Sequence, residues 1–184
     1  MIVVVAYAPG LLHRRVVPAV RRQGVEPRLL ELHGITYPLR LLELFDEMAE
    51  KDEPLCVIEQ DVEIRYGALA GFEECPEPWC FHAYPFSVPY DETGLTDWFS
   101  PLGCTRFRPE IAPVLQSLRE NPEFTISWVG RDVWTSRVLA DAGYRSHRHP
   151  GDMMHYHDYN ERPAPPPPPG TDALVEQGRR LAAS

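Results

Sequence analysis

Apolar and amphipathic segments alternate along the first third of the chain. Residues 2–7 are mostly β-branched and apolar, which predicts a buried strand, and residues 11–22 carry an apolar stripe at helical spacing. A second short strand is expected at residues 28–32, and a helix at residues 39–50, where leucines and Phe45 recur every three or four positions. This order of strand, helix, strand and helix predicts a parallel sheet with helices packed on it.

The next apolar stretch begins at Leu55 and ends in three acidic residues. Glu59, Asp61 and Glu63 follow the apolar positions at every second residue. Because side chains two apart in an extended segment point the same way, we expect these carboxylates to lie together at the carboxyl end of a strand. That edge of an α/β sheet suits a divalent cation and a phosphate held through it. A strand end with solvated charges is the alternative.

The remaining pattern predicts more elements of both kinds. Asp132 falls in the first turn of an expected helix, and Gly143 at the position just past its end. We expect strands at residues 79–84 and 124–129, helices at residues 67–72, 109–119 and 130–144, and an extended loop at residues 84–97.

The 184 residues predict a single folded domain over residues 1–160. Residues 161–170 are rich in proline and are expected to form a linker, and residues 171–184 a terminal helix or tail.

The formal charge of −9 and the single lysine, Lys51, argue against a protein that grips nucleic acid by general electrostatics. No window approaches the roughly 20 apolar residues of a membrane span. The apolar first residues lack a preceding basic region, so they predict a strand and not a signal peptide, and we expect a cytoplasmic protein.

The four cysteines stand in unlike contexts, and reduced thiols are expected. Cys75, Cys80 and His82 would suit zinc, and a non-catalytic zinc-binding module is therefore one alternative function. Four of the seven histidines fall between residues 147 and 157, as two His-x-His pairs.

Four segments in this order resemble the GT-A fold nucleotide-sugar glycosyltransferases, in particular their family-2-like group. They are the opening strand and turn at residues 3–9, the acidic strand end at 58–63, a Gly-x-x-x-Phe-Arg segment at 103–108, and the acid-led helix at 131–144, which ends in Ala-Gly-Tyr. The resemblance implies a compact, Rossmann-like GT-A fold, with a single mixed, mostly parallel sheet flanked by helices.

The resemblance implies a metal site and a donor site. Asp61 would be the principal ligand of Mn²⁺ or Mg²⁺, with Glu63 and with His155 or His157 as further ligands. The nucleoside-diphosphate sugar would be bound through its base and its ribose. The residues implied for the base are Tyr7, Ala8 and Pro9, and those near the ribose are Glu59 and Gln60.

The resemblance also implies a general base. Asp132 would take the proton from the acceptor hydroxyl, with inversion at the anomeric carbon. Its neighbour here is Arg131, where the family commonly has a second acid. The alternative is that Asp132 satisfies free backbone amides at the start of a helix.

The function expected is a metal-dependent glycosyltransferase that uses a nucleotide sugar. Its acceptor would be a protein, a modified nucleic-acid base or a small molecule. A metal-dependent nucleotidyltransferase is the second enzymatic alternative, although Ala8-Pro-Gly-Leu-Leu-His13 lacks the Gly-rich loop with Lys or Arg that such enzymes usually carry.

Overall fold

The computed structural model describes most of the first two thirds of the chain and several later segments. The described residues are 1–32, 36–82, 95–96, 103–122, 124, 131–150 and 153–156, of which 36–37 and 95–96 are described by their backbone alone. The expected linker at residues 161–170 and the expected tail at 171–184 lie outside these ranges, as do most of the expected loop at 84–97 and residues 125–129.

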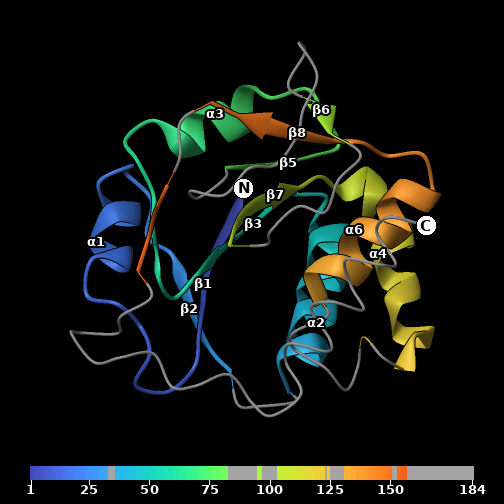
Figure 1. Cartoon of the computed structure of the whole chain (residues 1–184), viewed down its shortest axis with the longest axis horizontal. Coiled ribbons are helices and arrows are strands. Elements are labelled where there is room, and N and C mark those ends of the chain that lie inside the picture. Colours follow the sequence, from blue (N-terminus) through green and yellow to red (C-terminus); the bar gives the residue numbers. More distant parts are fainter. Residues whose placement is uncertain are drawn as a thin grey trace.

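A seven-stranded sheet in the order β2-β1-β3-β7-β5-β8-β6 forms the centre of the described structure (Figure 1). β7 and β6 run opposite to the other five strands. The predicted mixed, mostly parallel sheet is confirmed. The strands are β1 (Ile2–Tyr7), β2 (Arg28–Glu31), β3 (Leu55–Glu59), β5 (Trp79–His82), β6 (Leu95–Thr96), β7 (Cys104–Phe107) and β8 (Ser146–His149).

A second, two-stranded sheet lies beside the main one. It pairs β4 (Val62–Glu63) with β9 (Met154–His155) in antiparallel register, with Val62 opposite His155. The sequence pattern did not predict β6, β8 or β9, because each is too short, or too rich in charged and histidine side chains, to show a clear alternation.

Helices cover both faces of the sheet, and β1 supplies side chains to both. Val4 packs in the core formed with α2, α4 and α6, whereas Val3 and Val5 pack in the core formed with α1 and α3 (Figure 1). This alternation follows from the two-residue period of a strand. The helices are α1 (Val16–Arg21), α2 (Thr36–Lys51), α3 (Ala68–Glu74), α4 (Ala112–Gln116) and α6 (Arg131–Asp141).

Two helices differ from their predicted extents more than the others do. The helix expected at residues 11–22 begins only at Val16, because Ala8 to Leu11 form a turn in which Gly10 has a φ of +74°. The helix expected at 109–119 is broken into 3₁₀ turns, Pro109–Ile111 and Ser117–Glu120, on either side of α4. Pro113 would clash with the carbonyl of Pro109 in a continuous α-helix.

The C-terminal end of α6 is as predicted. Gly143 has a φ of +85°, and its amide bonds to the Ala140 carbonyl at 2.9 Å, while the Tyr144 amide bonds to the Leu139 carbonyl at 2.8 Å. These two bonds define a Schellman motif, which requires a residue that adopts positive φ readily.

The strand expected at 124–129 is wrong at Phe124, which has a helical backbone. None of the described helices is long and apolar enough to cross a membrane.

Glu47 of α2 links this helix to β2 and gives a pH-dependent prediction. Its carboxylate pairs with Lys51 and Arg28, each at 2.7 Å. The hydrogen bond from Lys51, followed by that from Arg28, holds the pKa of Glu47 below its ordinary value of 4.5 despite partial burial. A lowered folded-state pKa stabilises the fold above the unfolded value, and this contribution is lost as the pH falls through the folded-state pKa.

We therefore expect Glu47→Gln to lower the free energy of unfolding by about 0.5–1 kcal/mol at neutral pH, and to have little effect in strongly acidic buffer. Urea denaturation at the two pH values measures this difference. Glu50→Gln, at an exposed position of the same helix, is the control and should change little at either pH. An equal loss for Glu47→Gln at both pH values would contradict the ion-pair explanation.

Candidate functional site

The acidic segment after β3 turns where the sequence predicted a continuous extended chain. Glu59 is the last residue of β3, Gln60 and Asp61 form a turn, and β4 begins at Val62. The turn interrupts the two-residue period, so Glu59, Asp61 and Glu63 do not share one partner. Each carboxylate is bound by a different part of the chain.

Glu59 forms an ion pair with Arg131, the first residue of α6. The side chains of Arg131 and Glu59 are only 4% and 16% exposed, so the pair is largely withdrawn from water. Arg131 also lies beside Asp132, with 3.5 Å between its Nε and Oδ1 of Asp132. The ion pair therefore brings the predicted general base to the same end of the sheet as the acidic segment.

Asp61 meets His155, which the sequence places 94 positions later. Nε2 of His155 lies 3.2 Å from Oδ2 of Asp61, and the amide of Tyr156 donates to the Asp61 carbonyl at 2.8 Å. Pairing of β4 with β9 creates this meeting. The structure thus brings together two of the four predicted metal ligands, one carboxylate and one imidazole. His157 lies outside the described residues.

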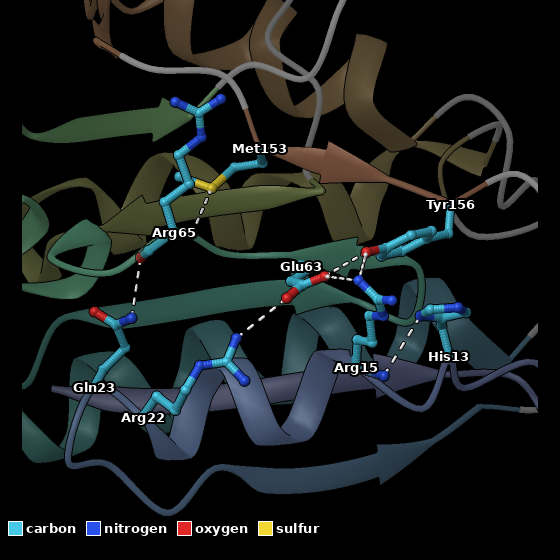
Figure 2. A network of polar contacts seen from close by, with 8 residues as sticks. All are labelled: His13, Arg15, Arg22, Gln23, Glu63, Arg65, Met153 and Tyr156. Atoms are coloured by element: carbon cyan, nitrogen blue, oxygen red, sulfur yellow. Dashed lines mark hydrogen bonds and ion pairs between the residues drawn. The ribbon is translucent and has the colours of Figure 1, made fainter.

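Glu63, the remaining predicted ligand, faces a different set of side chains. Figure 2 shows its carboxylate between Arg22, Arg15 and the hydroxyl of Tyr156, with 3.1 Å to Arg22 and 3.8 Å to Arg15. Among the described residues, no set of three His, Cys, Asp or Glu side chains that includes Asp61 converges closely enough for a metal. Glu63 instead ties α1 to the segment that carries His155.

Tyr156 and His13 belong to this region, although the sequence did not single them out. Their rings stack with centroids 3.9 Å apart, and the amide of His13 donates to the Gln60 carbonyl at 2.8 Å. Burial, followed by the hydrogen bond to Glu63, raises the pKa of Tyr156 above its ordinary value, so its hydroxyl stays protonated. No local sequence signal indicates such a contact, because it joins segments far apart in the chain.

The predicted base-binding residues lie at the carboxyl end of β1. The Tyr7 hydroxyl donates to Glu31 at 3.2 Å, and Pro9 is exposed in the turn that follows. The Ala8 amide donates to Oε1 of Gln60 at 2.6 Å. The Gln60 side chain therefore connects the turn after β1 with the turn after β3, and both turns lie at one edge of the sheet.

The described histidines of the two His-x-His pairs lie in different places. His147 and His149 belong to β8 and lie beside Cys75, whereas His155 lies beside Asp61.

All four cysteines are free thiols, as expected. The hydrogen bond from Cys80, followed by the contact with His149, lowers the pKa of Cys75 to about 3. Among the described residues, Cys75 groups with His147 and His149, and not with Cys80 and His82 as predicted, because β8 pairs with β5.

No protein-family profile and no curated protein sequence matches the chain. Solved structures do. A197 from STIV has a TM-score of 0.54 at 16% identity, over 86% of this chain and 87% of that one. CMP:2-keto-3-deoxy-manno-octonic acid synthetase, solved with CTP, has a TM-score of 0.50 at 12% identity, over 100% and 99%. A glycosyltransferase involved in glycosylation of the major capsid of PBCV-1 has a TM-score of 0.47 at 11% identity, over 81% and 82%.

The predicted fold class is confirmed. The likeness to A197 and to the synthetase extends over most or all of this chain, so the described sheet and its helices follow a known arrangement. At these identities the likeness concerns the fold alone.

The ion pair between Glu59 and Arg131 gives a stability prediction. Removing one partner of a largely buried pair takes away the main counter-charge of the other, although Asp132 still lies beside Arg131, so we expect Glu59→Gln or Arg131→Met to cost about 3 kcal/mol of unfolding free energy. The double variant should cost clearly less than the sum of the two single variants, because the lost interaction is shared.

Urea denaturation of the four proteins measures this cycle. Arg137→Met, which removes an exposed pair with Asp141 in the same helix, is the control, and its cost should stay below about 1 kcal/mol. Strictly additive single-variant losses would show that the two charges do not stabilise one another.

Proposed function

We propose that this protein is a metal-dependent glycosyltransferase that moves a sugar from a nucleoside-diphosphate sugar to an acceptor hydroxyl. The observation that carries the proposal is the approach of His155 to Asp61 at the carboxyl end of β3, with 3.2 Å between nitrogen and oxygen. Ligands in open α/β sheets bind outside the carboxyl ends of the strands, so this is where a donor nucleotide would be expected.

The residues present suit a divalent cation such as Mn²⁺ or Mg²⁺. Asp61 is 8% exposed and offers carboxylate oxygens, and His155 offers an imidazole nitrogen that Mn²⁺ accepts. Phosphate oxygens and water commonly complete such a shell. When bound, the cation would neutralise the charge that builds up on the departing nucleoside diphosphate. Glu63 is engaged by Arg15, Arg22 and Tyr156, so we assign it to positioning of the β9 segment.

The turn after β1 is proposed to contact the nucleoside. Tyr7, Ala8 and Pro9 lie at the carboxyl end of a strand adjacent to β3, and the Ala8 amide is held by Gln60. Because this turn is fixed to the acidic segment, it would hold the base at a set distance from the diphosphate bound near Asp61. Glu59 is engaged by Arg131, so of the two residues proposed near the ribose, Gln60 is the better placed.

Asp132 is the proposed general base. It stands in the first turn of α6, and its side chain is 20% exposed, which leaves it partly open to an acceptor. A carboxylate in its charged form can accept a proton from a hydroxyl. Attack by that hydroxyl from the face opposite the leaving group would invert the anomeric centre.

The donor site is tested with a thermal-shift screen of UDP- and GDP-sugars with and without Mn²⁺. A ligand that binds only the folded state adds about 2.7 kcal/mol of stability at one hundred times its Kd, and it therefore raises the melting temperature. We expect Asp61→Asn to abolish the Mn²⁺-dependent shift. Glu63→Gln should retain that shift even if its starting melting temperature is lower. Loss of the shift in Glu63→Gln but not in Asp61→Asn would refute the proposed ligands.

The base is tested with an active donor and acceptor pair. Asp132→Asn should lower kcat by about 10²–10⁴-fold and leave the Mn²⁺-dependent donor shift intact. Release of nucleoside diphosphate and formation of glycosylated product report the turnover. Full activity of Asp132→Asn would show that this residue serves only the helix end.

A nucleotidyltransferase is the second candidate, and one observation favours it. The whole chain aligns with the synthetase solved with CTP, at a TM-score of 0.50. The reactions differ in their products, because a nucleotidyltransferase releases pyrophosphate from a nucleoside triphosphate. Pyrophosphate release from CTP and a sugar acid, with no nucleoside diphosphate released from nucleotide sugars, would favour this candidate over the glycosyltransferase.

A further inference from the structure

A second group of metal-binding side chains lies on the α3 face of the sheet. Cys75, His147 and His149 each offer one ligand atom, and these atoms all lie within 4.8 Å of one another. Sγ of Cys75 lies 3.3 Å from Nδ1 of His147. Ligand atoms around a tetrahedral zinc ion stand roughly 3–4 Å apart, so small side-chain movements would close the group around an ion.

Strand pairing adds Cys80 as a fourth ligand. Cys80 lies directly opposite His147 in the parallel ladder of β5 and β8, and residues paired in this way point to the same face. His149 shares that face because it is two residues further along β8. Cys80 is fully buried, and its thiol interacts with that of Cys75. Cys80 therefore lies on the same face as the group formed by Cys75, His147 and His149, directly opposite His147.

The turn that carries Cys75 is held in place by two guanidinium groups. Arg106 and Arg108 of the β7 segment donate to the Cys75 carbonyl at 3.0 and 2.5 Å, and Arg106 also donates to the Glu77 carbonyl at 2.8 Å. Arg106 is only 1% exposed. Cys75 thus lies on a turn anchored to the sheet, and little further ordering is needed to bind an ion.

His149 supplies an independent observation. It is 8% exposed, and its Nε2 atom is buried with no partner at ordinary hydrogen-bond geometry in the described part of the chain. A buried imidazole nitrogen without a partner is costly, and a metal ion would satisfy it. Helix α3 approaches the same ring closely, since a Cβ atom at Gly71 would lie 3.6 Å from Nδ1 of His149.

We propose that Cys75, Cys80, His147 and His149 bind one zinc ion that fastens the end of α3 to β5 and β8. Two thiolates and two imidazoles in a closed tetrahedral shell are typical of structural zinc. Binding forms two Zn–S and two Zn–N bonds and releases to solvent any proton carried by the two thiols. The ion would link α3, β5 and β8 in the half of the sheet away from β1 and β2, where the strands are short.

This site is separate from the one proposed for the transferase. β5 and β8 are separated from β3 by β7, and the ligand set shares no residue with Asp61 or His155. Its role is structural, because four protein ligands leave no open position for a substrate. The zinc proposal therefore stands or fails independently of the proposed activity.

The test is metal analysis of the full chain, expressed with zinc in the medium and dialysed without chelator. We expect about one zinc per chain, and loss of most of it in Cys75→Ser and in His149→Gln. Two control variants should keep the metal: Cys104→Ala, which removes a buried thiol from β7, and His82→Gln, which removes the imidazole that the sequence pattern favoured. Absence of zinc from the wild-type protein, or its retention in Cys75→Ser, would overturn the proposal.

Cobalt substitution of the wild-type protein gives a second measurement that does not depend on any variant folding. Co²⁺ in this site should show the intense visible bands of tetrahedral coordination together with thiolate charge-transfer absorption, and one equivalent of Zn²⁺ should abolish both. Thiol titration of the unfolded protein should find all four cysteines reduced. A disulfide between Cys75 and Cys80, or an octahedral cobalt spectrum, would overturn the zinc assignment.

Discussion

The buried ion pair between Glu59 and Arg131 is the constraint on which the rest of the candidate site depends. It fastens the carboxyl end of β3 to the start of α6, two elements that no local interaction joins. A charge buried to this extent is tolerated only with a partner, so both ends are held in one arrangement. The pair engages the Glu59 carboxylate and brings Asp132 to the sheet edge. Asp61, the next acid of the segment, faces His155 instead.

The approach of His155 to Asp61 depends in turn on a second set of contacts. Glu63 joins Arg22, the residue just after α1, to Tyr156, and this tyrosine directly follows His155 (Figure 2). The short pairing of β4 with β9 contributes few backbone bonds, and these side-chain contacts add to it in holding the segment that carries His155. Glu63, which the sequence suggested as a ligand, thus holds the segment that carries His155, a proposed ligand.

The same sheet places a second polar group on its α3 face. β8 aligns with β5 so that His147 lies opposite Cys80, and Cys75 approaches from the end of α3. His147 and His149, which stand eight and six residues before His155 in the sequence, therefore belong to a different group. In the proposed arrangement one site is open and uses a carboxylate and an imidazole, and the other is closed and uses two thiolates and two imidazoles.

The sequence alone determined the α/β class, the two opening strand and helix steps, the acidic end of β3 and the glycine cap at Gly143, because these depend on short-range periodicity and backbone preference. Only the tertiary structure decided which partner each polar side chain takes. Glu59 and Arg131 are 72 residues apart, and no pattern in either segment indicates that the two side chains pair. The turn at Gln60 and the pairing of β8 with β5 likewise arise from packing of the whole sheet, which redirects Glu63 and separates His149 from His155.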